Sequence, residues 1–168
     1  MIKKINSRRD LISLRLFFIM AKKEGDSMEK LTQIYRTYAE ETARVLRDAK
    51  PLDGLFGFGD DPRKDPCHMR FYEETERWAK CFMASEPAGE AVYDAVHFLL
   101  QTPDAYREKS CFWFMYAAQG FAREMIPKLD SIQCAQLRDL YDALYPKRDR
   151  MPVQTEVYKL LKKGSKRR

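Results

Sequence analysis

The chain has 168 residues, of which 45% are apolar and 33% are charged, and this balance excludes a disordered or fibrous protein and suits a single globular domain. Its formal net charge is +6, but only the two ends are basic, and residues 28–146 carry more acidic than basic groups. No apolar run is long enough to cross a bilayer, so we expect no membrane span.

The four cysteines are widely separated in the sequence, and no secretory signal precedes them. This spacing is typical of reduced thiols, so we expect a cytoplasmic protein without disulfides. Cys81 and Cys111 have apolar neighbours, and we expect both to behave as small buried hydrophobes.

Two interpretations of residues 1–27 stay open. Residues 23–25, Lys-Glu-Gly, can be encoded by a purine run that contains a bacterial ribosome-binding sequence, a few codons before Met28. This favours a bacterial protein whose translation starts at Met28, with residues 1–27 as a translated leader. The alternative is a loosely attached N-terminal helix. A secretory signal is disfavoured, because Arg15 interrupts the apolar stretch and no small-residue cleavage site follows.

From Met28 onward, apolar residues recur at helical spacing, and proline and glycine separate the segments. Helices are expected over residues 28–49, 66–85, 87–101, 103–126, 131–145 and 152–164. Their predicted starts are caps at Ser27, Asp65, Thr102 and at Asp130 or Ser131, together with Pro87 and Pro152. Gly164 is expected to close the last helix. The buried stripes are expected to include Met69 and Tyr72 in the second helix and Ile132 in the fifth.

The sequence shows no sustained alternation of apolar and polar residues, so we predict an all-α fold, an irregular helical bundle of about six to seven helices. The helix at 103–126 is expected at its centre, because residues 111–118 are apolar on every face. Residues 28–146 would form the bundle core, and residues 147–168 a basic C-terminal helix and tail. A helical-hairpin repeat is the alternative, since Pro66 and Pro103 are 37 residues apart, but the residues that follow them do not match.

Asp65, Cys67 and His68 bring a carboxylate, a thiol and an imidazole to one helix start, where a thiol pKa is lowered. A metal site needs three or four converging ligands, however, and neighbouring helical side chains point about 100° apart. We therefore predict no metal, no cofactor and no catalytic residue, and a thiol- or metal-dependent enzyme at Cys67 and His68 is the least favoured function. His97, within an apolar stretch, is expected to be a hydrogen-bonded core or groove residue.

Two features favour binding functions. Leu55, Phe56 and Phe58 place large apolar groups on a glycine-rich loop, where they could dock a protein partner. The final ten residues contain six cations and no acid, which suits contact with nucleic acid or an acidic partner surface. These cations are Lys159, Lys162, Lys163, Lys166, Arg167 and Arg168.

The sequence therefore predicts a small, non-catalytic helical protein that binds or regulates a protein partner. The first alternative is a nucleic-acid-associated protein that uses the basic C-terminal segment. A second alternative is an accessory or inhibitory protein from a mobile element. The oligomeric state is left open by these patterns.

Overall fold

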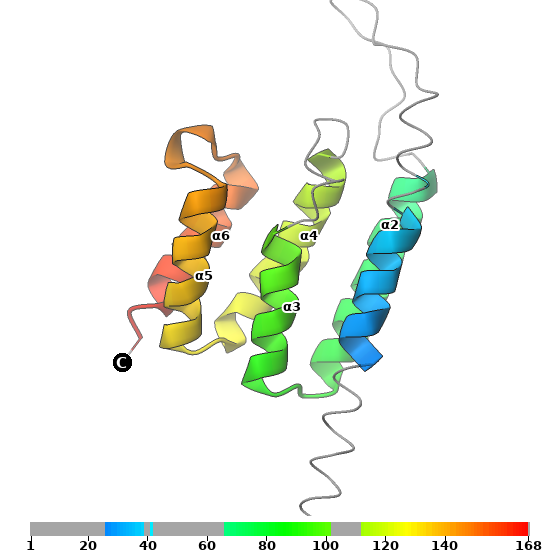
Figure 1. The fold of residues 1–168 in the computed structure, drawn as a ribbon, viewed down its shortest axis with the longest axis horizontal. Coiled ribbons are helices and arrows are strands. Elements are labelled where there is room, and N and C mark those ends of the chain that lie inside the picture. The colour runs from blue at the N-terminus through cyan, green and yellow to red at the C-terminus, as the bar shows by residue number, and fades with distance from the viewer. Residues whose placement is uncertain (1–25, 39–40, 42–65, 102–111, 168) are drawn as a thin grey trace, which may run out of the picture.

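The computed structural model describes residues 26–38, 41, 66–101 and 112–167, and within these ranges it contains helices and no strand (Figure 1). The six α-helices within these ranges confirm the predicted all-α bundle. They are an N-terminal helix that includes residues 26–38, followed by α2 (Pro66–Ala84), α3 (Gly89–Gln101), α4 (Phe112–Met125), α5 (Ser131–Leu144) and α6 (Pro152–Gly164). Short 3₁₀ turns, η4 (Ile126–Lys128) and η5 (Lys147–Asp149), precede α5 and α6.

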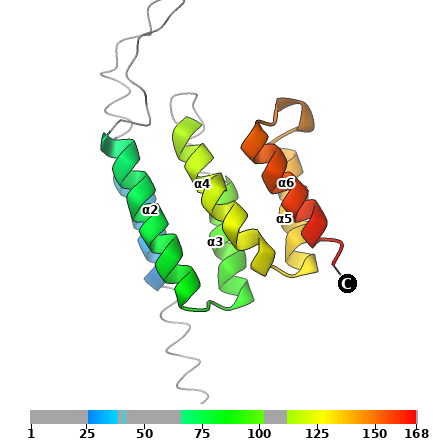
Figure 2. The ribbon, with the colours of Figure 1, turned by 180° about the vertical axis from the view of Figure 1, so that it is seen from behind.

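The helices lie in two layers (Figures 1 and 2). The N-terminal helix, α3 and α5 form one layer, and α2, α4 and α6 form the other. Consecutive helices pair across the layers, with α3 against α4 and α5 against α6. Helix α4 occupies the middle of its layer, between α2 and α6, as expected for the segment predicted at 103–126. Within the bundle, helical hairpins thus lie side by side, although their sequences do not repeat.

Aromatic side chains connect the N-terminal helix to α3 in its own layer and to α2 in the other layer. The ring of Tyr35 meets the rings of Phe71 in α2 and Phe98 in α3 edge to face, with centroids 5.2 and 4.9 Å apart. The indole Nε1 of Trp78 donates to the backbone oxygen of Ser27 at 2.8 Å and to its hydroxyl at 3.0 Å. Ser27 lies inside the helix, one residue after helical Asp26, so its predicted role as the cap is wrong.

Local backbone chemistry determines where α5 and α3 begin. The carboxylate of Asp130 accepts from the backbone N–H of Gln133 at 2.8 Å, and the Gln133 side chain accepts in return from the Asp130 N–H at 3.1 Å. This capping box identifies Asp130 as the cap of α5. Pro87 was expected to open a helix, but α3 begins two residues later, because Glu86 adopts a positive φ of 50° in the intervening turn.

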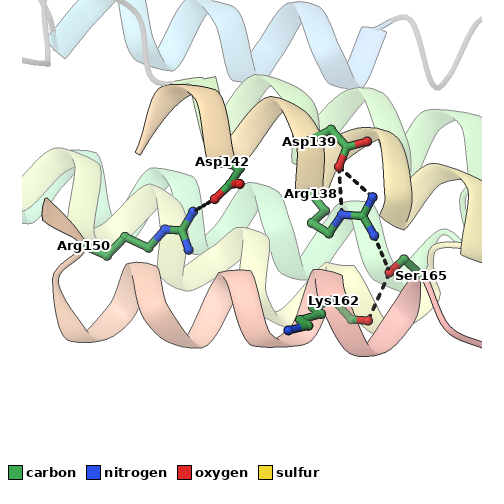
Figure 3. Close-up of polar contacts among 6 residues, drawn as sticks. All are labelled: Arg138, Asp139, Asp142, Arg150, Lys162 and Ser165. Carbon is green, nitrogen blue, oxygen red and sulfur yellow. Dashed lines mark hydrogen bonds and ion pairs between the residues drawn. The ribbon is translucent and has the colours of Figure 1, made fainter. Parts of the chain in front are cut away.

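The connection from α5 to α6 is organised around Arg150, whose side chain is only 4% exposed (Figure 3). Its guanidinium carbon lies 3.9 Å from the centroid of the Tyr158 ring, and its Nε donates to the backbone oxygen of Tyr145 at 2.8 Å. An ion pair with Asp142 completes its contacts. These contacts offset the cost of burying the guanidinium charge. Because Asp142 belongs to α5 and Tyr158 to α6, the Arg150 side chain also holds the two helices together.

The buried stripe of α5 differs from the expected one. Ile132 was expected to face inward, but it is 69% exposed. The cap at Asp130 sets the phase of the helix so that Cys134, Leu137 and Tyr141 face the core instead. The hydroxyl of Tyr141 donates to Oε1 of the buried Gln119 at 2.8 Å, which ties α5 to α4.

Candidate functional site

A groove of about 440 Å³ lies between α2 and α4. Its apolar lining comes from Met69 and Tyr72 of α2 and from Tyr116, Ala117 and Phe121 of α4. Three of these side chains are unusually exposed for their size, since Met69 is 48%, Tyr72 44% and Tyr116 46% accessible. Large apolar groups gathered in a surface hollow are typical of a binding site.

The phase of α2 places Met69 and Tyr72 in this groove, so the prediction that they face the core is wrong. The buried stripe of α2 instead contains Cys67, Phe71, Thr75, Trp78, Ala79 and Phe82. Each helical residue is turned by about 100° from the one before it, so apolar side chains just beside the stripe face another direction. Met69 and Tyr72 face α4 instead, and the centroids of the Tyr72 and Phe121 rings lie 5.3 Å apart.

Gly120 gives the groove part of its depth. A Cβ placed on Gly120 would meet no atom within 4 Å, so the space above this residue is open. Glycine in a helix interior costs roughly 1 kcal/mol relative to alanine, and a glycine between Tyr116 and Phe121 was the sequence signal that could have identified the groove.

Two carboxylates give the groove an acidic edge. Glu73 of α2 and Glu124 of α4 both line it, and within the described residues neither forms an ion pair. Arg123, which also lines the groove, is engaged elsewhere: its guanidinium lies 2.6 Å from the carboxylate of Glu156 in α6. The charges that remain uncompensated at this groove are therefore negative.

The structure separates Cys67 from His68. Cys67 is only 3% exposed, and its Sγ lies 3.8 Å from the backbone oxygen of Tyr38, whereas His68 lines the groove. In the described ranges, no three side chains of His, Cys, Asp or Glu are grouped as metal ligands. His97 does not line the α2–α4 groove. It is partly buried beside the Tyr93 ring, and its Nε2 lies 3.2 Å from the Gln101 amide nitrogen, which agrees with the hydrogen bonding expected for this residue.

The other predicted binding residues fall in different places. Leu55, Phe56 and Phe58 lie outside the described residues, as do Cys111 and Arg168. The remaining cations of the C-terminal segment are exposed on α6 and on the residues that follow it; they are Lys159, Lys162, Lys163, Lys166 and Arg167. None of these cations lines the α2–α4 groove, although α6 reaches the edge of the groove through the ion pair between Glu156 and Arg123.

Comparison of the chain with known protein families, curated proteins and solved structures found no match. Among the helices that the structure describes, none has both the length and the apolar character needed to cross a bilayer. The fold and the site together define an all-α helical bundle with an apolar, acid-edged groove on one of its two layers.

Proposed function

We propose that this chain is a non-catalytic binding protein whose α2–α4 groove accepts an amphipathic helix of a protein partner. The observation that carries this proposal is the exposure of Met69, Tyr72 and Tyr116 around one hollow. Burial of such side chains drives association, and an apolar groove between two helices suits the apolar face of a third helix.

The edge of the groove indicates the chemistry of the partner. Glu73 and Glu124 leave two carboxylates uncompensated at the rim, so lysine or arginine next to the apolar stripe of the partner helix would pair with them. An acidic helix would be repelled by the same carboxylates. The proposed ligand is therefore a basic amphipathic helix with apolar residues at three- and four-residue steps.

The lining of the groove is mainly apolar and aromatic, which supports the proposed binding role. The polar groups that line it belong to His68, Glu73, Arg123, Glu124 and the two tyrosine hydroxyls. The residues Leu55, Phe56 and Phe58, which precede α2, stay a proposed additional contact with the same partner. We keep an inhibitory or accessory role in a mobile element as an alternative, and a bacterial, cytoplasmic setting stays part of the proposal.

Photocrosslinking tests the proposed function. A photoreactive phenylalanine replaces Tyr116, the protein is irradiated in cells, and the crosslinked peptide is sequenced. The expected peptide is a basic amphipathic segment of another protein, and Gly120→Leu should abolish the crosslink by filling the groove. The matched control is Gly89→Leu, because Gly89 is an exposed glycine at the start of α3, away from the groove. A crosslink that survives Gly120→Leu, or that joins only two copies of the chain, contradicts the proposal.

A further inference from the structure

Four lysines form a stripe along the outer face of α6 and the turn that follows it. Lys159, Lys162, Lys163 and Lys166 are all exposed. Spacings of three and four residues place the first three on one side of the helix, and Lys166 follows in the turn after it. The opposite side of α6 is buried: Val157, Leu161 and Gly164 pack into the protein. We call these four residues the lysine stripe.

The charge of the lysine stripe is not compensated within the described residues. None of the four ammonium groups forms an ion pair there, and residues 157–167 include no aspartate or glutamate. The preceding acid on the same face is Glu156, whose carboxylate is neutralised by Arg123 at 2.6 Å. Cations near a helix C-terminus interact favourably with the helix dipole, but this stabilisation is limited to the last turn and needs only one or two cations.

The stripe belongs to a rigid element rather than to a free arm. The hydroxyl of Ser165 donates to the backbone oxygen of Lys162 at 3.0 Å and accepts from the Arg138 guanidinium at 3.2 Å (Figure 3). Arg167 is directed away, because its guanidinium donates to the backbone oxygen of Pro127 at 2.9 Å. The end of α6 is thus fastened to α5 and to η4, and the lysines project from a fixed helix.

We propose that the lysine stripe binds the phosphate backbone of a nucleic-acid duplex. Seven residues at a helical rise of about 1.5 Å span about 10 Å, and Lys166 lies in the turn just after α6. Over that length each strand of a duplex presents about three phosphates, so the two strands that border one groove offer enough phosphates for all four lysines. Lysine ammonium groups act as flexible point charges and lack the planar fork of arginine or the paired donor and acceptor of an amide, so we expect phosphate contacts and binding that is independent of sequence.

Fluorescence anisotropy with a labelled 20-base-pair DNA duplex tests this proposal. Four phosphate contacts give a slope of about −3.6 for log affinity against log salt, so affinity should fall about 150-fold between roughly 50 and 200 mM salt. Lys159→Glu combined with Lys163→Glu should weaken binding at least tenfold and reduce the slope to about −1.8. Circular dichroism checks that the variant keeps its helices.

The matched control separates position from net charge. Lys30→Glu combined with Arg36→Glu changes two exposed cations of the N-terminal helix, neither of which forms an ion pair among the described residues, and it lowers the net charge by the same amount. This control should keep the salt slope of the unmodified protein, and so should Gly120→Leu, because the groove is separate from the stripe. An equal loss in both double variants overturns the proposal. Preferential binding to polyglutamate or to anionic lipid vesicles at the same salt concentration also overturns it.

Discussion

Gly164 packs directly against the sulfur of Cys134, so that a Cβ on Gly164 would overlap the Sγ atom. The sequence pattern explains this glycine as a helix stop, where a left-handed conformation is common. Gly164 is indeed the last residue of α6, but its own φ is not in the left-handed region, and Ser165 after it also keeps a right-handed helical conformation with a φ of −64°. What requires glycine here is therefore the close approach of α6 to α5.

Gly164→Ala should destabilise the protein by about 1–3 kcal/mol, because the added methyl group has no space. This cost exceeds the gain of roughly 0.5–1 kcal/mol that alanine brings to a helix. Urea unfolding of Gly164→Ala, Cys134→Ala and the double variant measures the coupling of the two positions. Removal of the sulfur should rescue part of the loss, and additive effects of the two substitutions would contradict the close contact.

Gly120→Ala should have the opposite effect on stability. A methyl group at this position meets open space, so only the better helix propensity of alanine remains, and the unfolding free energy should rise by about 0.5–1 kcal/mol. Thermal and urea unfolding measure the change. A loss of stability would mean that the groove above Gly120 is filled by another part of the protein.

Thr75 is a polar residue on the buried stripe of α2. Its side chain is 0% exposed, and among the described residues its hydroxyl has no hydrogen-bond partner. Thr75→Val has nearly the same shape and removes the uncompensated hydroxyl, so it should stabilise the protein by about 1 kcal/mol in urea unfolding. Thr75→Ser keeps the hydroxyl but loses a methyl group and should destabilise it.

Stability should decrease in alkaline solution. Burial raises the pKa of the Cys134 thiol, against the lowering effect of the Arg167 guanidinium, and burial raises the pKa of the Tyr141 hydroxyl far more strongly. Above about pH 9–10 the unfolded chain releases protons that the folded protein retains, so the unfolding free energy falls with increasing pH. Below that range the thiol and the hydroxyl are protonated in both states, so their full contribution to the unfolding free energy is present.

Urea unfolding between roughly pH 7 and 11 measures this dependence, and Tyr141→Phe is the informative variant. It should be less stable at neutral pH, because the hydrogen bond to Gln119 is lost, but its stability should fall less steeply above pH 10. Equal slopes for the variant and the unmodified protein would show that Tyr141 ionises as readily in the folded state as in the unfolded chain.

The predictable part of the fold depends on local chemistry. Pro66 and Pro152 start helices because proline fits the first helical position, and Asp130 caps α5 through groups three residues away. Such signals lie within one turn of the chain, so the sequence alone indicates them. The two-layer arrangement depends instead on which helix faces meet, and residue spacing does not determine that.

The α2 side of the groove was not predictable from the sequence, because α2 has apolar residues on more than one face, whereas Gly120 was a sequence signal on the α4 side. Residue spacing does not show whether Met69 and Tyr72 or Cys67 and Phe71 face the core. The buried face is harder to recognise because it includes the polar residue Thr75. Only the packing of α2 against both the N-terminal helix and α4 decides between these faces. The same reason explains Cys81, which has apolar neighbours in sequence but is exposed in the structure.

Thiol alkylation tests both this assignment of faces and the weakest functional hypothesis. In a Cys111→Ser background, Cys81 should react with iodoacetamide at the rate of an ordinary exposed thiol, whereas Cys67 and Cys134 are buried and should react only when the protein unfolds. Mass spectrometry of peptides after timed alkylation distinguishes the three residues, and a urea-unfolded sample serves as the control. Fast alkylation of Cys67 in the folded protein would contradict its burial beneath the N-terminal helix and would restore the reactive thiol hypothesis.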